Sequence, residues 1–494
     1  MRTYTRREVL GRIGKVASAA GAVALCSSGR AAETRKRPNI VLIYVDDMGW
    51  TDLGCFGSKF YETPNIDRLC GQGMKLTSTY AACTVCSPSR AALLTGRYPA
   101  RTGITQWIRG GNRKGEGYQT KSRRPLLEPI NQGYLRPREI TIAELLKTVG
   151  YTSCHVGKWH LGGGPYRPES QGFDFNYGGC ERGSPPGYYD PYRNALPGLK
   201  GRKAGEYLTD RESDEAVRFL RKHRDRPLFL YMSHYAVHMP LQGRADLVEK
   251  YKAKQPVGKH KSPVYAAMVE SVDQSTGKIL RALDELGLAD KTIVIFTTDN
   301  GGVDAIANGH ARAYVTNNAP LRSGKCWPYE GGIRVPGIVR WPGVTKPGSA
   351  SDEPIIGMDF FTTVCTAAGA KVPTDRPIDG LDLRPVLSGK GSLKRDAIFW
   401  HRPHYQHATP HGTVRAGDWK LIRYYEDDAV ELFNLADDLS ETTNLADKQP
   451  AKVKDLLAKL DAWLKATGAK MPIPNPNYGG GSRKPRPAKN TRRA

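Results

Sequence analysis

Oxygen-bearing side chains follow two separate apolar runs of this 494-residue sequence. Asp46 and Asp47 come directly after one run rich in Ile and Val, and Asp299 and Asn300 come after another. Such short runs predict buried strands, and parallel strands bring their carboxyl ends to one edge of a sheet. Four side chains of this kind would repel one another without a cation, and Ca²⁺ or Mg²⁺ prefers all-oxygen ligands. Ordinary turns remain an alternative, because Asp-Asn-Gly is a common turn sequence.

A second candidate centre is Cys86, which opens the segment CSPSRAALLTG. Ser87 can cap a helix and Pro88 suits a first turn, so we expect Cys86 at a helix N-terminus, where backbone amides favour an anion. Arg90 lies one turn further and can reach the same anion. Two other interpretations stay open here: a thiolate nucleophile with a lowered pKa, or a CxxC pair with Cys83 that serves redox chemistry or half of a metal site.

The elements that must position these residues alternate along the chain. Strands are predicted at 38–45, 151–156, 227–232 and 292–298, and amphipathic helices at 141–149 and 264–286. This alternation predicts an α/β domain with a largely parallel sheet that helices cover on both faces. From about Leu387 the pattern changes to short alternating segments at 397–400, 419–425 and 430–435, followed by a helix at 451–466. That pattern predicts a small antiparallel sheet with a helix against it.

These patterns divide the chain into four regions. We expect an export signal at 1–32, a catalytic α/β domain at 36–386, a smaller α+β domain at 387–470 and a basic, Pro/Gly-rich tail without fixed structure at 471–494. The signal is predicted from Arg6 and Arg7 ahead of a short Ala/Gly-rich stretch, which is typical of twin-arginine export. A basic tail without a targeting role is the alternative. The chain has no run of about 18 apolar residues, so no transmembrane span is expected.

The net charge of +25 is distributed unevenly along the chain. Residues 1–37 contribute +7 and the tail from Tyr478 contributes +6, which leaves +12 for the body. Long-range steering follows net charge, so the body could attract a polyanion such as a nucleic acid or a sulfated polysaccharide. A basic surface that serves solubility alone is the other interpretation.

Several longer motifs carry a resemblance to a known family. Cys86-Ser87-Pro88-Ser89-Arg90 resembles the C-x-P-x-R motif of type I (formylglycine-dependent) sulfatases in the alkaline phosphatase superfamily. The resemblance extends from about Asn39 to Leu445. Its other motifs are GYTS at 150–153 with GKWHLG at 157–162, DNG at 299–301, NAPLR at 318–322 with Lys325, YEGGIR at 329–334 and DWKL at 418–421.

This resemblance implies a fold and a metal centre. The fold would be an alkaline-phosphatase-like domain with a mostly parallel mixed sheet flanked by helices, plus a smaller C-terminal domain with a four-stranded antiparallel sheet and a helix. The resemblance also implies that a calcium ion, rather than Mg²⁺, is held by Asp46, Asp47, Asp299, Asn300 and the modified Cys86. A formylglycine-generating enzyme would convert Cys86 to formylglycine (3-oxoalanine). Its hydrated form would attack sulfur, release the alcohol and then expel sulfate.

The same resemblance assigns the surrounding residues. Arg90, Lys158 and Lys325 would bind the diol and the sulfate oxygens, where fixed cations stabilise developing charge. His160 would act as a base near the diol, and His238 would act as an acid for the departing oxygen. Lys158, His238, Lys325 and His310 are the candidate substrate-binding residues. Trp107, Arg109 and the histidines 401, 404, 407 and 411 are candidates for the pocket rim.

Three positions depart from the family pattern. Thr84 replaces a small residue two positions before Cys86, Ser323 replaces a frequent glycine, and Cys326-Trp327-Pro328 replaces a small, polar stretch. These changes would reshape the pocket near the sulfate while keeping the charged residues.

The sequence as a whole resembles the arylsulfatase and N-acetylgalactosamine-6-sulfatase branch. It therefore predicts a bacterial sulfuric ester hydrolase, periplasmic or secreted, that acts on a sulfated carbohydrate or an aryl sulfate, with no nucleic-acid partner. One alternative is a phosphate or phosphonate monoester hydrolase of the same superfamily, although those enzymes usually use Ser or Thr as nucleophile. The other is a non-catalytic protein that binds sulfated glycans through its positive charge.

Overall fold

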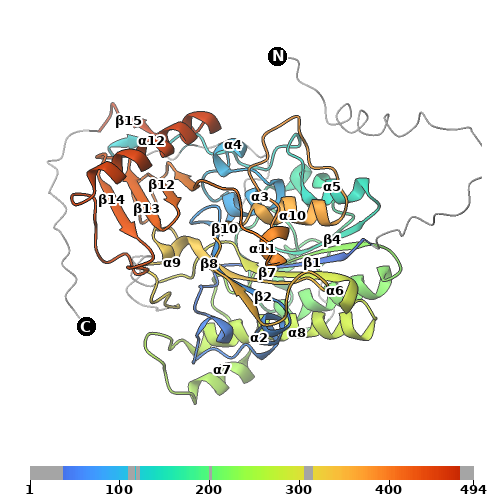
Figure 1. Ribbon diagram of the computed structural model, residues 1–494. Helices are drawn as coiled ribbons and strands as arrows, with labels where there is room; N and C mark the ends of the chain where they lie inside the picture. The colour runs from blue at the N-terminus through green and yellow to red at the C-terminus, as the bar shows by residue number, and fades with distance from the viewer. Residues whose placement is uncertain are drawn as a thin grey trace, which may run out of the picture.

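The computed structural model describes residues 37–109, 117, 119, 123–199, 203–304 and 315–478. A nine-stranded sheet forms the centre of the larger part, in the order β10-β2-β8-β7-β1-β6-β4-β5, with β9 paired to β2 (Figure 1). β8 is antiparallel to both of its neighbours, and the remaining pairs are parallel. The strands are β1 Asn39–Val45, β2 Met74–Tyr80, β4 Thr152–Gly157, β5 Phe175–Tyr177, β6 Leu228–Ser233, β7 Thr292–Thr298, β8 Arg334–Arg340, β9 Ser349–Ser351 and β10 Ile355–Ile356.

Helices cover both faces of this sheet (Figure 1). One face carries α2 Pro64–Gln72, α6 Leu208–His223, α7 Ala245–Lys252 and α8 Pro263–Glu285; the other carries α3 Cys86–Thr95, α4 Pro99–Thr102, α5 Ile142–Thr148, α10 Asp359–Ala367 and α11 Arg384–Leu387. Short 3-10 turns lie at Gly54–Phe56, Gly164–Tyr166, Pro168–Gln171, Tyr192–Asn194 and Ala289–Lys291. Two hydrophobic cores therefore exist, one on each side of the sheet.

The central strand β1 shows why the sequence folds this way. Its successive side chains point to opposite faces, because the side-chain period of a strand is two. Val41, Ile43 and Val45 enter the core beneath α6 and α8, whereas Ile40 and Leu42 enter the core beneath α3 and α5. Apolar residues are thus needed from Ile40 to Val45, and each fully buried one contributes about 1.5–3 kcal/mol. The polar residues that follow the strand lie at its carboxyl end.

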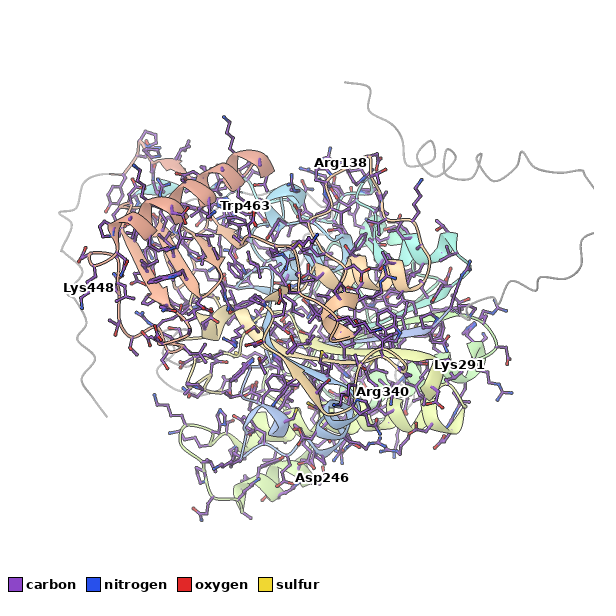
Figure 2. The ribbon with its side chains drawn as sticks, viewed as in Figure 1. Arg138, Asp246, Lys291, Arg340, Lys448 and Trp463 are labelled. Carbon is purple, nitrogen blue, oxygen red and sulfur yellow. The ribbon has the colours of Figure 1, made fainter. Side chains whose placement is uncertain are left out.

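A smaller, four-stranded antiparallel sheet lies beside the larger one. Its strands run in chain order as β11 Ile398–Arg402, β12 His411–Ala416, β13 Trp419–Tyr424 and β14 Val430–Asn434. Helix α12, Pro450–Thr467, buries Leu456, Leu460 and Leu464 against this sheet. Trp463 of α12, labelled in Figure 2, stacks on Phe399 at 5.0 Å and meets Tyr98 of the larger part edge-on at 4.9 Å. An aromatic contact therefore joins the two parts.

The predicted fold class is confirmed. In the large sheet the sequence patterns located β1, β4, β6 and β7 but not β2, β5, β8, β9 and β10. In the smaller sheet the resemblance implied four strands, but no pattern located β12, because its sequence HGTVRA contains a glycine and lacks a clear alternation. The tail was expected to be without fixed structure from Met471, but β15, Ile473–Pro474, pairs with β3, Leu126–Leu127. Residues 479–494 and the predicted export signal lie outside the described residues. Among the described helices, none has both the length and the apolar character that a membrane crossing requires.

Candidate active site

Four neighbouring strands deliver polar side chains to one edge of the large sheet. Asp46 and Asp47 follow β1, Lys158 follows β4 and Asp299 follows β7. β1 pairs with β7 and with β6, and β6 pairs with β4, all in parallel. Their carboxyl ends therefore meet at one edge, as the sequence predicted. His238 belongs to the loop after β6. The topology therefore brings together residues that are up to about 250 positions apart in the chain.

Oxygen atoms of the predicted metal ligands are concentrated in this edge. Ligand atoms of Asp46, Cys86 and Asp299 all lie within 4.8 Å of one another. Asp46 Oδ1 and Asn300 Oδ1 are buried and accept no hydrogen bond from the described residues. Burial and the neighbouring Asp299 raise the pKa of Asp46 well above its usual range. Unpartnered oxygens and crowded carboxylates fit a hard divalent cation, which would satisfy the oxygens and relieve the repulsion.

Each of the three carboxylates at this edge of the sheet is paired with a cationic side chain. Lys158 Nζ lies 2.5 Å from Asp46 Oδ2. Lys325 Nζ lies 2.6 Å from Asp47 Oδ1, and although burial opposes its charge, Asp47 raises the pKa of Lys325. Arg90 Nη2 lies 2.7 Å from Asp299 Oδ2. Each cation is thus paired with a carboxylate, and Lys325 also lines a cavity, where it can meet an anionic ligand.

Cys86 is the first residue of α3, at the base of that cavity. The predicted cap differs: Val85 occupies the N-cap position without a side-chain bond, and Ser87 Oγ instead accepts a hydrogen bond from the amide of Ile108 at 3.0 Å. Burial raises the pKa of the Cys86 thiol, although Lys158 and Lys325 oppose the shift. An unmodified Cys86 is therefore held as a neutral thiol, which argues against a thiolate nucleophile.

His160 is oriented toward Cys86 by a backbone carbonyl. Its Nε2 donates to Ile108 O at 2.6 Å, which leaves Nδ1 as an acceptor 3.3 Å from Cys86 Sγ. Burial, with Lys158 nearby, holds the pKa of His160 well below its usual value, so the ring is neutral. A β-carbon at Gly183 would lie 2.6 Å from the ring, so glycine is needed there. His160 has the geometry of a base aimed at residue 86.

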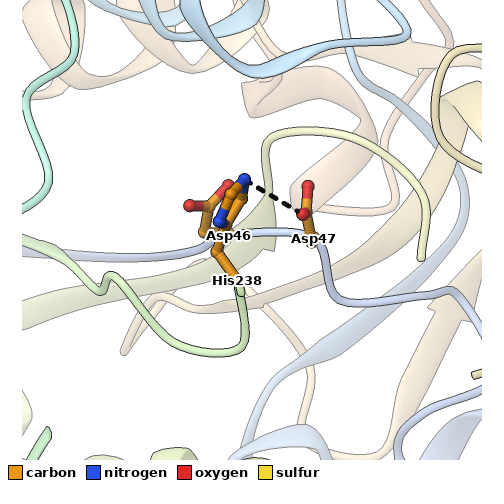
Figure 3. A group of neighbouring side chains, drawn as sticks. All are labelled: Asp46, Asp47 and His238. Carbon is orange, nitrogen blue, oxygen red and sulfur yellow. Dashed lines mark ion pairs between the residues drawn. The ribbon is translucent and has the colours of Figure 1, made fainter. Parts of the chain in front are cut away.

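The ring of His238 lies beside Asp46 and faces Asp47 (Figure 3). Its Nδ1 donates to Met239 O at 2.8 Å, and its Nε2 is 3.5 Å from Asp47 Oδ2. Burial and Lys325 lower the pKa of His238 to about 3. An arriving anion would raise this pKa and favour a proton on Nε2, which is the atom that faces Asp47.

A cavity of about 250 Å³ opens above Cys86. Its lining combines predicted catalytic residues with others: Val85, Cys86, Trp107, Ile108, His160, Gly183, Ser184, His238, Lys325 and Gln406. The expected rim residue Trp107 therefore lines it. Gly183, Ser184 and Gln406 were missed, because nothing in their local sequence distinguishes them from ordinary loop residues.

The other rim candidates differ in their placement. His401, His404 and His411 are buried and engaged elsewhere, so their assignment to the rim is wrong. His401 bonds Tyr425, and His404 lies between Thr105 and Glu128. His407 and Arg109 are exposed and are not among the lining residues. His310 lies outside the described residues.

The departures from the family pattern cluster next to Cys86. Ser323 has φ of 59°, a left-handed conformation that explains the frequent glycine at this position. The amide of Cys326 donates to Thr84 O at 2.9 Å, and Cys326 packs with Cys83 and Val85. Two of the unusual residues thus contact each other, and the segment before Cys86 is braced by the segment after Lys325.

Comparisons with known proteins agree with this geometry. The sulfatase family profile matches residues 38–370, and a profile described as N-sulphoglucosamine sulphohydrolase, C-terminal, matches residues 323–470. A sulfatase of Formosa agariphila is 34% identical over 89% of this chain and 91% of its own length. The N-acetylgalactosamine-6-sulfatase of Mus musculus is 37% identical over 80% of this chain and 75% of its own.

A solved structure gives the same answer for the fold. The crystal structure of Ps i-CgsB is 30% identical, with a TM-score of 0.74 over 87% of this chain and 93% of its own. The same protein has been solved in complex with k-i-k-neocarrahexaose. The chain belongs to the sulfatase family and is a sulfuric ester hydrolase with an alkaline-phosphatase-like fold.

Proposed function

We propose that this protein is an exported, calcium-dependent sulfatase that uses a formylglycine made from Cys86 to hydrolyse sulfate esters of a carbohydrate. One observation carries the proposal. Cys86 begins a helix at the base of a cavity, within 4.8 Å of ligand atoms of Asp46 and Asp299 and 3.3 Å from a neutral histidine nitrogen. Residues that could serve as nucleophile, cation ligands and base thus lie together, which supports the proposal.

Asp46, Asp47, Asp299 and Asn300 would hold the calcium ion. Asp46 Oδ1 and Asn300 Oδ1 are buried and accept no hydrogen bond from the part of the chain that the structure describes, and none of the four residues is a histidine or a cysteine. Both facts favour a hard cation over zinc. When bound, the ion supplies the positive charge that lowers the pKa of a hydroxyl group at residue 86. Arg90, paired with Asp299, holds one carboxylate in place from outside the oxygen set.

Formylglycine at position 86 would give the chemistry that a thiol lacks. Once hydrated, it has two hydroxyl groups on one carbon, the first to attack sulfur and the second to expel sulfate. The neutral thiol described above offers neither group. His160 Nδ1 is positioned to take the proton of the second hydroxyl, because Nε2 is engaged with Ile108.

The remaining residues would bind and protonate the substrate. Lys325 lines the cavity, and Lys158 lies buried behind it on Asp46; their ammonium groups would neutralise the sulfate oxygens. His238 lines the cavity together with Lys325. The negative charge of a bound ester would raise the pKa of His238 and favour a proton on Nε2, which would then donate it to the leaving oxygen.

A sulfated carbohydrate is the proposed substrate class. The similarity to an N-acetylgalactosamine-6-sulfatase and to a structure solved with k-i-k-neocarrahexaose supports it, as does the basic body of the chain. Export to the bacterial periplasm or beyond is proposed from Arg6 and Arg7. Replacing both arginines with lysine should retain the protein in the cytoplasm, which cell fractionation measures.

Mass spectrometry of the Cys86 peptide tests the central claim. Active enzyme is expected to carry a peptide about 18 Da lighter than the thiol form, and to release sulfate from sulfated monosaccharides. Full activity with an intact thiol would contradict the mechanism. Assays with 4-nitrophenyl sulfate and 4-nitrophenyl phosphate separate this proposal from a phosphate ester hydrolase, which would prefer the second compound.

A further inference from the structure

The residues that line the cavity above Cys86 fall into two chemical groups. One half of the lining contains the charged and titratable groups already described. The other, uncharged half consists of Val85, Trp107, Ile108, Gly183, Ser184 and Gln406. Ligand sites commonly combine an aromatic wall with a few placed polar groups that fix orientation. The uncharged half is therefore the part of the cavity that meets whatever carries the sulfate.

Arg402 ties the segments of this uncharged half together. It ends β11 in the smaller domain and is only 1% exposed. Its Nη1 donates to Cys326 O at 2.8 Å, and its Nη2 donates to Gln106 Oε1 at 3.2 Å and to Gln406 Oε1 at 2.6 Å. One buried guanidinium thus connects three loops that are separated by up to about 300 residues. Its planar set of donors suits such a role.

The contact with Arg402 fixes which end of the Gln406 amide faces the cavity. A guanidinium can only donate hydrogen bonds, so the oxygen of Gln406 must point toward Arg402. The NH₂ group is then the end that remains for the cavity that Gln406 lines. The backbone is fixed as well, because Gln406 and Ala408 exchange hydrogen bonds at 3.1 and 2.6 Å. Gln406 is a preorganised donor beside the catalytic centre.

Arg402 also positions Trp107, through Gln106. Gln106 Oε1, which accepts from Arg402, also accepts from the amide of Trp107 at 3.1 Å. The position of the indole therefore depends on the same guanidinium as that of Gln406. An indole offers a wide apolar face at low entropic cost, and such faces cover the C–H groups of sugar rings.

From this geometry we propose that Trp107 and Gln406 form the sugar-recognition wall of the enzyme, with Arg402 as the positioning residue. The inference rests on the proposed sulfatase function and goes further by naming what selects the substrate. Trp107 covers one face of a sulfated pyranose while the Gln406 NH₂ donates to an acceptor oxygen on the ring. The smaller domain therefore contributes Gln406 and Arg402 to a recognition wall that Trp107 of the larger domain completes.

The test compares recognition of the sugar with recognition of sulfate alone. The variant Gln406→Met removes the donor without adding charge, and Arg402 keeps its bonds to Cys326 and Gln106. The matched control is Gln72→Met, since Gln72 also accepts from an arginine, Arg340 at 3.1 Å, but is exposed and does not line the cavity. The probes are 6-sulfated N-acetylgalactosamine, galactose and glucosamine, with inorganic sulfate as a product inhibitor.

For Gln406→Met we expect kcat/KM on the best sugar sulfate to fall about tenfold or more, mainly through KM, because one hydrogen bond to the substrate is lost. The inhibition constant of inorganic sulfate should stay within about twofold of wild type, since the charged half is intact. Gln72→Met should change neither. Trp107→Ala should also raise KM, and Trp107→Phe should restore part of the loss.

Arg402→Lys tests the positioning role. A lysine cannot reach all three loops, so KM for the sugar should rise while the sulfate inhibition constant changes little. An equal loss in both constants would mean a merely structural role and would overturn the inference. Unchanged sugar kinetics in Gln406→Met, or a wild type that hydrolyses 4-nitrophenyl sulfate and none of the sugars, would overturn it too. A wild type that releases no sulfate from any probe would instead overturn the proposed function, and this inference with it.

Discussion

The protein buries two clusters of opposite charges that differ in what surrounds them. The first is the catalytic cluster described above, at the carboxyl edge of the large sheet. The second lies between the two domains, where Lys420 of β13 sits 2.8 Å from Glu330 of α9 (Glu330–Ile333) and 2.8 Å from Glu441. All three of these side chains are completely buried. Both clusters thus contain carboxylates and cations in a low-dielectric environment.

The two clusters differ in how closely a cation approaches the oxygens that lack a hydrogen bond, and in whether a cavity adjoins the cluster. In the interdomain cluster, Glu330 also accepts from Tyr80 at 2.6 Å, and Glu441 accepts from the amide of Glu330 at 2.7 Å. In the catalytic cluster, Asp46 Oδ1 and Asn300 Oδ1 lack a hydrogen bond among the described residues, and Arg90 Nη2 stays 3.7 Å from Asp46 Oδ1. Glu441 Oε1 of the interdomain cluster also lacks a hydrogen bond there, but Lys420 Nζ lies only 2.8 Å from it. The catalytic cluster also adjoins a cavity, which His238 and Lys325 line. Charged residues buried together therefore do not identify a site. Incomplete pairing next to a cavity does.

The largest expected effect is on the catalytic side. Cys86→Ala should reduce sulfate release by several orders of magnitude, because the residue that forms the covalent bond is gone, while the melting temperature changes little. Sulfate release measured by ion chromatography checks this. Cys83→Ala is the control, since Cys83 is a neighbouring buried thiol; a comparable loss there would point to a shared redox role for the pair.

Asp299→Asn should weaken calcium binding by about a hundredfold or more, because one ligand charge is removed and Arg90 loses its partner. Calorimetric titration of the apoprotein measures the affinity. Asp273→Asn serves as a control, since Asp273 is buried but binds the amides of Asn65 and Ile66 at the start of α2. If both variants bound calcium like wild type, Asp299 would be removed from the ligand set.

Lys420→Met should lower the free energy of unfolding by about 3–5 kcal/mol, because two buried carboxylates lose their shared cation. Urea unfolding measures this, and calcium should not rescue it, since none of the three side chains is a proposed metal ligand. The kcat of the protein that remains folded should be close to wild type. A selective loss of kcat with normal stability would mean that the two clusters are functionally coupled.

The smallest effect concerns pH. Burial raises the pKa of Glu441 to about 7, above its unfolded value, although Lys420 opposes the shift. A carboxyl with a raised folded pKa favours folding when it is protonated, so its contribution is present at low pH and is lost as pH rises from about 4.5 to 7. Glu441→Gln should flatten this part of the stability profile, measured by urea unfolding between pH 4.5 and 8. The exposed Glu249→Gln should keep the wild-type slope; an unchanged slope in Glu441→Gln would contradict the assignment.

The strand ends were predictable because local patterns determine them. The apolar runs before Asp46 and Asp299 are long enough to specify buried strands, and parallel pairing then brings the polar residues to one edge. The helix that begins at Cys86 was predictable in the same way. Its cap was not, because Ser87 bonds the amide of Ile108, a partner 21 residues away that local propensity does not include.

The sugar-facing half of the cavity was not predictable in the same way. Gln406 lies about 300 residues from Gln106, and it lines the cavity only because the smaller sheet packs beside the larger part. The histidines near it attracted attention by residue type, yet His404 and His411 are buried, and His404 is bound to Thr105 and Glu128 of the larger part. Residue type reveals charged chemistry in a sequence, whereas neutral recognition groups are defined by three-dimensional neighbours.

The pairing of β15 with β3 has a consequence for the order in which the chain matures. Asn475 donates to Arg124 O and Pro125 O, at 2.9 Å in both cases, so the segment at 124–127 is bound by residues made about 350 positions later. A ribosome adding amino acids one after another leaves this early segment without its strand partner until residues 473–475 have been made. Nascent chains that stop before residue 473 should therefore be cleaved by protease near residue 125, where the finished protein is protected.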